Sequence, residues 1–256
     1  MPCFIKRPTR QTAEPIPITA EEFNRIAAAK DQLLRALMIE EKFVLVLENL
    51  IEFEEQLFAL TLRRSITMHE RWASFQEDIF TVNRRVVNLL AAFGLYRDQV
   101  PKDLVAIYGR DSAVGATFDD TREKERTDTF GFDIVETLRD HVMHRDFAVR
   151  ELSFPGERHE EDGRITWRQR IEPRVRVADL LADRRISEGT KASLAKCEPI
   201  ERITPWIRGY VDAIGRIHAA LRTAMAADIK SWENELEAVL ERGRERLGES
   251  AHGYVA

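Results

Sequence analysis

The sequence predicts an all-α protein: a helical bundle of long antiparallel helices with one small β-hairpin insertion. Hydrophobic residues make up 44% of the 256 residues, enough to fill a core. Over most of the chain apolar side chains recur every three or four residues, as one face of a helix requires. Over 147–177 this spacing changes to the alternation typical of strands. We therefore expect an extended arm over 1–18 and a single helical domain over 19–250 that contains the hairpin.

The first helix begins at a capping signal. Thr19 can accept a hydrogen bond from the third residue of the helix, and Glu22 stands where a capping box places its acid. Apolar residues then keep a helical spacing from Phe23 to about Arg64. This pattern predicts either one very long helix or two helices with a break near Met38–Glu41.

A second helix is expected from about His69 to Tyr96. Gly94 and Pro101 are residues that commonly end helices, so they mark its end. A short helix and a loop are expected over 101–120.

The next helix should begin at Asp119–Asp120 and run through Met143. Beyond it, 147–149 and 152–154 predict extended chain, the acidic stretch Glu157–Asp162 predicts a turn, and Ile165–Ile171 alternates as a strand does. Together these segments predict the antiparallel hairpin.

Two helices complete the prediction. Val177–Ala182 is expected to be a short helix, and a linker around Ser187–Pro199 follows it. From Ile203 to Val239 the apolar residues recur so regularly that we expect one long helix, used for packing or for coiled-coil-like pairing.

Composition limits the possible partners. The net charge of −5 excludes a globally basic nucleic-acid binder, so a nucleic-acid site would be a local patch. Cys3 and Cys197 belong to no motif, which favours reduced thiols and a cytoplasmic protein. The N-terminus does not resemble a secretory signal, and no run of about 18 apolar residues predicts a membrane span.

One stretch suggests chemistry. Arg139, Asp140 and His144 lie on one predicted helix; a guanidinium can hold a phosphate while an imidazole moves a proton. Asp140 lies four residues before His144, on the same face, and could orient its ring. Arg139 and His144 are five residues apart, about 140° around an ideal helix. They converge only through a local distortion or through two copies, so an active site here predicts a homodimer.

The residues near this motif suggest further roles. Arg145, Arg164, Arg168 and Arg170 are candidates for contact with a nucleic-acid backbone, and the alternative is an exposed hairpin with solvated arginines. His141 and His144 could be two metal ligands, with Asp140 or Asp146 as a third. A zinc or iron site needs three or four ligands at matched spacing, and no CxxC, HExxH or paired ExxH motif is present, so no metal or other cofactor is expected.

Two other histidines have simpler interpretations. The Arg-x4-His spacing recurs at Arg64 and His69, near the predicted end of a helix, where we interpret it as coincidence. His218 borders the apolar stripe of the last helix and is expected to be a structural histidine with satisfied hydrogen bonds.

The pattern R-[N/D/H]-x-x-x-H resembles the signature of the HEPN superfamily. The similarity extends over Phe130–Val149 and Ile207–Asp212, and in scattered patches over about 20–245. The chain departs from the related pattern at Asp140, where Asn is usual, and at Arg145–Asp146. A carboxylate near a phosphate is repulsive unless it is paired, so the first departure leaves the role of Asp140 open.

The resemblance implies a metal-independent endoribonuclease that acts as a toxin or defence effector. Arg139 would stabilise the scissile phosphate, and His144 would transfer the proton as the RNA 2′-hydroxyl attacks, leaving a 2′,3′-cyclic phosphate. An antitoxin or a nucleotidyltransferase would then be a partner. Two alternatives stay open: a catalytically inactive HEPN-like dimer that binds a partner, and an unrelated helical scaffold in which the three motif residues form a structural cluster.

Overall fold

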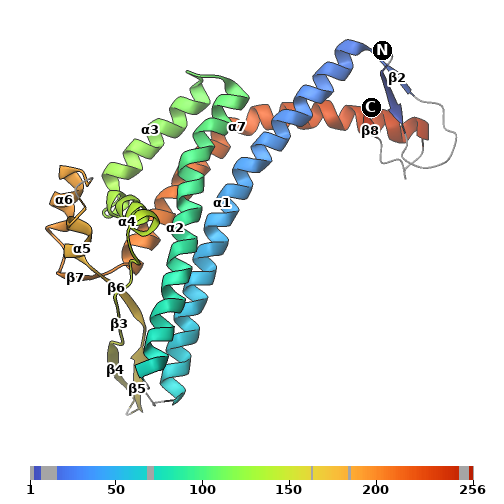
Figure 1. The fold of residues 1–256 in the computed structure, drawn as a ribbon. Coiled ribbons are helices and arrows are strands. Elements are labelled where there is room, and N and C mark those ends of the chain that lie inside the picture. The colour runs from blue at the N-terminus through green and yellow to red at the C-terminus, as the bar shows by residue number, and fades with distance from the viewer. Residues whose placement is uncertain are drawn as a thin grey trace.

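Three long helices determine the architecture of the computed structural model, which describes residues 3–6, 16–67, 72–162, 164–183, 186–247 and 254–255. Helices α1 (Ala20–Thr67) and α2 (Trp72–Tyr108) form an antiparallel pair, and α7 (Thr204–Leu247) packs against α1 and crosses it (Figure 1). The outer parts of α1 and α7 leave the body of the molecule together as an arm. The fold is therefore mainly α-helical, as predicted.

Four shorter helices form a lobe on one side of this frame. α3 (Ala113–Asp128) packs on α7, and α4 (Phe132–His144) lies between α2 and α7. α5 (Val177–Leu181) and α6 (Glu188–Leu194) contact the far side of α4. Because α4 touches elements on several sides, the motif residues have fixed positions in the fold.

The strands form a ribbon beside the lobe and a small sheet at the end of the arm. β3 (Glu151–Ser153), β6 (Glu172–Arg176) and β7 (Ile200–Arg202) make one sheet, and β4 (Gly156–Glu161) pairs with β5 (Arg164–Gln169) as a projecting hairpin. This confirms an antiparallel hairpin after the motif helix. At the end of the arm lies a sheet of order β2-β1-β8, whose strands are Cys3–Lys6 (β1), Ile16–Ile18 (β2) and Tyr254–Val255 (β8).

Packing decides one open alternative, which concerns α1, and changes four predicted boundaries. Helix α1 is uninterrupted, so no break occurs at Met38–Glu41, where Ile39 is buried. Its predicted cap is confirmed, because the Glu22 N–H donates to Oγ1 of Thr19 at 3.1 Å. Burial of an apolar residue on each turn stabilises a continuous helix more than the polar residues there weaken it.

The prediction that the second helix ends near Gly94 and Pro101 is wrong. α2 continues through both residues to Tyr108. Proline within a helix removes one hydrogen bond, but Val100 and Leu104 are buried on either side of it, so core packing outweighs that loss.

The motif helix begins later than predicted. Instead of one helix from Asp119–Asp120, there are two, separated at Thr129–Gly131. Gly131 has a φ of 91°, which favours glycine, and a Cβ atom there would lie 3.0 Å from Cδ1 of Trp206. The chain therefore turns at Gly131, beside the indole ring of Trp206.

Two further segments differ from the prediction. The acidic stretch Glu157–Asp162 is mostly strand β4, and the turn is confined to its end, where Asp162 has a φ of 50°. The predicted linker at Ser187–Pro199 contains α6, because Oγ of Ser187 caps that helix by accepting the Thr190 N–H at 3.1 Å. In the first case strand pairing, and in the second a helix cap, outweighs a composition that is typical of turns and loops.

Candidate functional site

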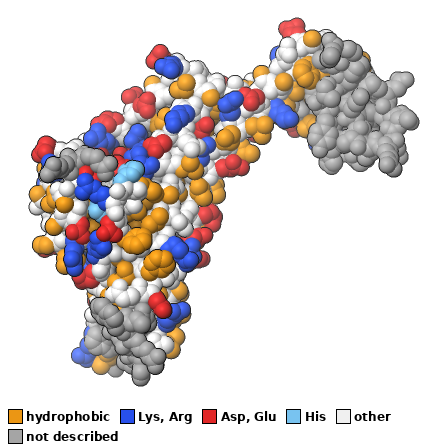
Figure 2. All heavy atoms as spheres, viewed as in Figure 1, with side chains coloured by type: hydrophobic (Ala, Val, Ile, Leu, Met, Phe, Trp, Pro, Cys, Tyr) orange, Lys and Arg blue, Asp and Glu red, His pale blue; other side chains and the backbone are white. Residues whose placement is uncertain are grey.

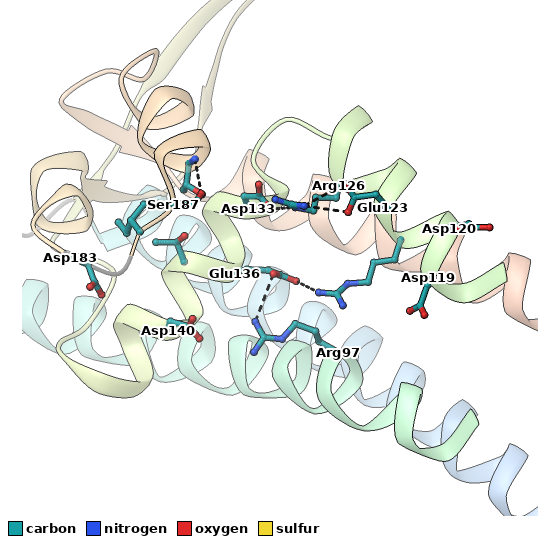
Figure 3. Close-up of a pocket in the computed structure, with 14 residues that line it drawn as sticks. Arg97, Asp119, Asp120, Glu123, Arg126, Asp133, Glu136, Asp140, Asp183 and Ser187 are labelled. Carbon is teal, nitrogen blue, oxygen red and sulfur yellow. Dashed lines mark hydrogen bonds and ion pairs between the residues drawn. The ribbon is translucent and has the colours of Figure 1, made fainter. Parts of the chain in front are cut away.

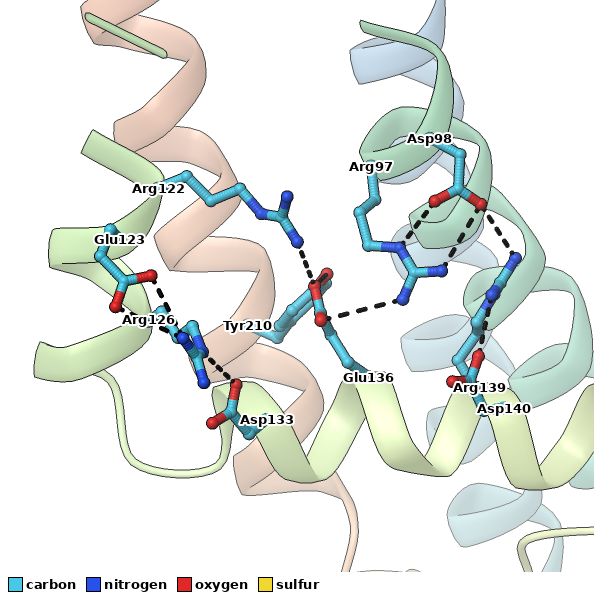
Figure 4. Close-up of polar contacts among 10 residues, drawn as sticks. All are labelled: Arg97, Asp98, Arg122, Glu123, Arg126, Asp133, Glu136, Arg139, Asp140 and Tyr210. Carbon is cyan, nitrogen blue, oxygen red and sulfur yellow. Dashed lines mark hydrogen bonds and ion pairs between the residues drawn. The ribbon is translucent and has the colours of Figure 1, made fainter. Parts of the chain in front are cut away.

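The side chain of Arg139 extends from α4 toward α2, and two carboxylates bind its guanidinium. Its Nη1 donates to Oδ1 of Asp140 at 2.9 Å and its Nη2 to Oδ2 of Asp98 at 3.2 Å (Figure 4). The guanidinium crosses Gly94 of α2, where a Cβ atom would lie 2.6 Å from Nε of Arg139. Nε itself is buried without a hydrogen-bond partner. A glycine in the middle of α2 thus makes the room for this arginine.

The same crevice continues as a chain of ion pairs. Arg97 donates to Asp98 at 2.8 Å and lies 3.8 Å from Glu136, which also accepts from Arg122 at 3.1 Å and from the Tyr210 hydroxyl at 3.3 Å. Burial opposes ionisation of Asp98, but the hydrogen bond and charge of Arg97 and the charge of Arg139 outweigh it, so the pKa of Asp98 is lowered. The arginines and acids here are already paired with one another.

A groove of about 710 Å³ adjoins this crevice, between α3, α4 and the segment that leads into α6 (Figure 3). Acids outnumber arginines in its lining: Asp119, Asp120, Glu123, Asp133, Glu136, Asp140 and Asp183 face Arg97, Arg122 and Arg126. Arg126 is itself paired with Asp133 at 2.8 Å. The surplus of negative charge makes this groove unfavourable for a phosphate backbone.

The structure separates the two central motif residues. His144 is the last residue of α4 and is exposed, whereas Arg139 is turned toward α2. Among the described residues, His144 makes no hydrogen bond or ion pair with Arg139 or Asp140. The buried histidine of the motif is instead His141, which is 5% exposed; burial, with the charge of Arg145, lowers the pKa of His141. One chain alone therefore does not bring the guanidinium and the exposed imidazole together.

The predicted nucleic-acid contacts are dispersed. Arg145 donates to Oδ1 of Asp183 at 3.0 Å, and Arg170 donates to Oε1 of Glu172 at 2.7 Å. Arg164 is exposed opposite Glu161 in the hairpin, and the side chain of Arg168 lies outside the described residues. Arg145, Arg164 and Arg170 therefore do not form one patch.

The other two histidine interpretations have separate outcomes. His218 is 1% exposed and bonds Tyr96 through Nδ1 at 3.2 Å and Glu40 through Nε2 at 3.1 Å, so it is a structural histidine as expected. His69 lies outside the described residues. Its motif partner Arg64 bonds Asp78 at 2.9 Å and stacks on the Phe154 ring at 4.0 Å, which is a structural role.

The exposed face of α1 is a feature that the sequence predictions do not include. Nine large apolar side chains on this helix are between 41% and 71% exposed: Leu34, Leu37, Met38, Val44, Leu45, Ile51, Phe58, Leu62 and Ile66. Figure 2 shows hydrophobic side chains at the surface of both the body and the arm, interspersed with acidic and basic ones. The signal was present in the sequence, because α1 is apolar around most of its circumference and a two-helix contact can cover only part of it.

The described residues hold no group of three or more His, Cys, Asp or Glu side chains arranged to bind a metal ion. No helix in the described ranges is long and apolar enough to span a bilayer. Comparison with known proteins found no matching family model, curated protein or solved structure.

Proposed function

We propose that this protein is a non-catalytic interaction module whose helix α1 binds a basic amphipathic helix of a partner protein. The exposed apolar face of α1 carries this proposal. Leu37, Val44, Ile51 and Phe58 lie seven residues apart on this face and are 47% to 70% exposed. A row with this period is one of the two rows that form the seam of a coiled coil; in the second row, three residues before each of Val44, Ile51 and Phe58, stand the acids Glu41, Glu48 and Glu55.

The size of the face supports a protein partner. Nine large side chains that are about half exposed amount to on the order of 800 Å² of surface, similar to one side of a standard protein interface. Covering the α1 face would therefore remove from water an area typical of a specific protein interface.

The acidic residues on the α1 face determine which kind of partner helix can bind. Glu41, Glu48 and Glu55 are exposed and also lie seven residues apart, between the apolar positions. Two copies paired antiparallel about Glu48 would bring Glu48 against its own counterpart and Glu41 against Glu55, and parallel copies would align each glutamate with itself. Like charges at such positions destabilise pairing. A partner helix with Lys or Arg opposite these acids avoids the repulsion.

The test uses two synthetic amphipathic helices that differ only in their flanking residues, Lys in one and Glu in the other. Isothermal titration should detect binding of the Lys helix and none of the Glu helix. The triple variant Glu41→Lys/Glu48→Lys/Glu55→Lys should reverse this preference. Ile51→Ser/Phe58→Ser should bind neither helix, with its circular dichroism unchanged because both side chains are exposed.

Two results would overturn the proposal. One is equal binding, or no binding, of both helices by the wild-type chain. The other is a wild-type dimer in light scattering that Ile51→Ser/Phe58→Ser converts to a monomer, because the α1 face would then join two copies. As a control, Phe80→Ser removes an exposed aromatic side chain on α2 and should leave helix binding intact.

A second candidate function is the metal-independent ribonuclease that the HEPN resemblance implies. The exposure of His144 favours it, since a histidine that transfers protons must reach substrate. Activity would need a homodimer that sets His144 of one copy near Arg139 of the other, with an RNA phosphate displacing Asp98 and Asp140 from that arginine. Purified protein incubated with RNA in EDTA should then produce cyclic-phosphate ends, and His144→Ala should not. Equal inertness of both proteins leaves the interaction module.

A further inference from the structure

Three arginines surround one buried glutamate on the sheet β3-β6-β7. Oε1 of Glu172 accepts from Nε of Arg170 at 2.7 Å and from Nη1 of Arg202 at 3.1 Å. Its Oε2 accepts from Nη2 of Arg174 at 3.4 Å and from Oγ of Ser153 at 3.4 Å. One carboxylate thus gathers three guanidiniums from three chain segments at a single place.

The arrangement leaves donors available to solvent. The Glu172 side chain is 8% exposed, whereas those of Arg170, Arg174 and Arg202 are 56%, 30% and 43% exposed. Arg202 uses only Nη1 in the side-chain contacts of the described chain, and Arg174 uses Nε, toward Ser153, and Nη2. The remaining guanidinium N–H groups have no protein partner there, so an anion at the surface can be bound by more than one arginine.

Charge balance points the same way. Within the cluster itself, three guanidiniums and one carboxylate leave a charge of about +2. Glu157 lies 3.8 Å from Nη1 of Arg170, Glu151 is opposite Arg174 in the strand register, and the Glu201 carboxylate accepts the Arg202 backbone N–H. The strand register also places Arg174 directly opposite Arg202 on the neighbouring strands β6 and β7, which fixes these two arginines beside each other. Burial opposes ionisation of Glu172, yet its bonds with Arg170 and Arg202 lower the pKa of that carboxyl.

We propose that Arg170, Arg174 and Arg202 form a phosphate-binding site, with Glu172 as the group that positions them. A phosphate presents several acceptor oxygens and up to two negative charges, which match the planar N–H donors and the local charge. The phosphate could be free in solution or part of an RNA backbone. This site is separate from the α1 face, and neither proposal depends on the other.

The experiment compares sodium phosphate with sodium chloride at equal ionic strength. Phosphate should raise the melting temperature of the wild-type chain by a few degrees, since a ligand that binds only the folded state stabilises it. Arg202→Gln should lose that shift, while two arginines remain to satisfy Glu172. Arg170→Gln provides a second variant if Arg202→Gln does not fold.

Fluorescence anisotropy with a single-stranded RNA distinguishes the two sources of phosphate. Binding that is about tenfold weaker in Arg202→Gln, with a smaller dependence on salt, identifies RNA as a ligand. A phosphate shift without RNA binding identifies a free phosphate or a phosphorylated small molecule.

The matched control is Arg208→Gln. Arg208 is 59% exposed and is paired one-to-one with Glu54 at 2.7 Å. Arg208→Gln therefore removes the same charge as Arg202→Gln, but from outside the cluster. It should retain the phosphate shift. If Arg208→Gln loses as much as Arg202→Gln, the effect is one of general charge and the site does not exist. Equal melting temperatures of the wild-type chain in phosphate and chloride, without RNA binding, would also overturn the proposal.

Discussion

Arg139 of α4 lies directly across Gly94 of α2, close enough that a Cβ atom at position 94 would be 2.6 Å from its Nε. Gly94→Ala must therefore displace the arginine, and we expect it to stabilise the chain little or not at all. Gly215→Ala, where a Cβ atom meets nothing within 4 Å, should stabilise α7 by about 0.5–1 kcal/mol. Urea denaturation measures both changes.

Removing the arginine provides the decisive control. In an Arg139→Ala background, Gly94→Ala should stabilise as Gly215→Ala does, since the three atoms that lie nearest to the added Cβ all belong to the Arg139 side chain. If Gly94→Ala gives the same gain in both backgrounds, the close contact does not exist.

A second prediction concerns Asn83, which is 2% exposed and fastens the chain just after the motif helix. Its Nδ2 donates to the Val149 carbonyl at 2.9 Å, and its Oδ1 accepts the Val149 N–H at 2.9 Å. Asn83→Ala should lower the free energy of unfolding by about 2–4 kcal/mol, because it leaves both backbone groups buried and unpaired. Asn49→Ala, which removes one solvent-exposed bond to the Leu45 carbonyl within α1, should cost about 0.5 kcal/mol. Comparable losses would show that Asn83 is not a fastening point.

The pH dependence of stability should depend on His218. Burial lowers the pKa of folded His218, although its bond with Glu40 opposes this, so the unfolded chain takes up the proton first. Stability should therefore fall as the pH drops below about 6.5, the unfolded value, until the folded pKa is reached. His218→Gln should make the curve less steep between about pH 7.5 and pH 5 in denaturation experiments, and the slope that remains is expected from His141, whose pKa burial also lowers. His159→Gln, in the exposed hairpin, should keep the wild-type slope; an unchanged slope in His218→Gln would contradict the assignment.

Glu172 should contribute more to stability than an ordinary surface acid. Glu172→Gln leaves three guanidiniums without their shared counter-charge, and we expect a loss of about 2 kcal/mol, smaller than for a fully buried ion pair because the arginines are partly exposed. Glu157→Gln, whose carboxylate is 57% exposed, should change thermal stability by less than about 0.5 kcal/mol. A loss at Glu172 no larger than at Glu157 would indicate that the cluster contributes little to the fold.

The mainly helical fold was predictable because it depends on short-range periodicity. The cap at Thr19 and the long last helix follow directly from apolar spacing and capping chemistry. The boundaries that failed depend on distant residues. Gly131 ends one helix and begins another because Trp206, far along the chain, occupies the space beside it, and Pro101 is tolerated because its neighbours are buried. No local pattern contains that information.

The candidate site was predictable only as a set of residues. The sequence placed Arg139 and His144 on one helix, but the partners of Arg139 come from α2, 41 positions earlier in the chain for Asp98. The cluster at Glu172 combines neighbouring positions of β6 with Arg202 of β7. The partners of a charged side chain are set by tertiary packing, which spacing along the chain does not reveal.

The continuity of α1 has a mechanical consequence. Forty-eight residues in one helix extend about 70 Å, so a tilt of about 5° at one end displaces the other by about 6 Å. The helix is a lever that joins the small sheet at the termini to the end of the molecule where the hairpin projects (Figure 1). A tilt of the helix therefore moves both of its ends, and spin labels placed at the two ends would detect that movement.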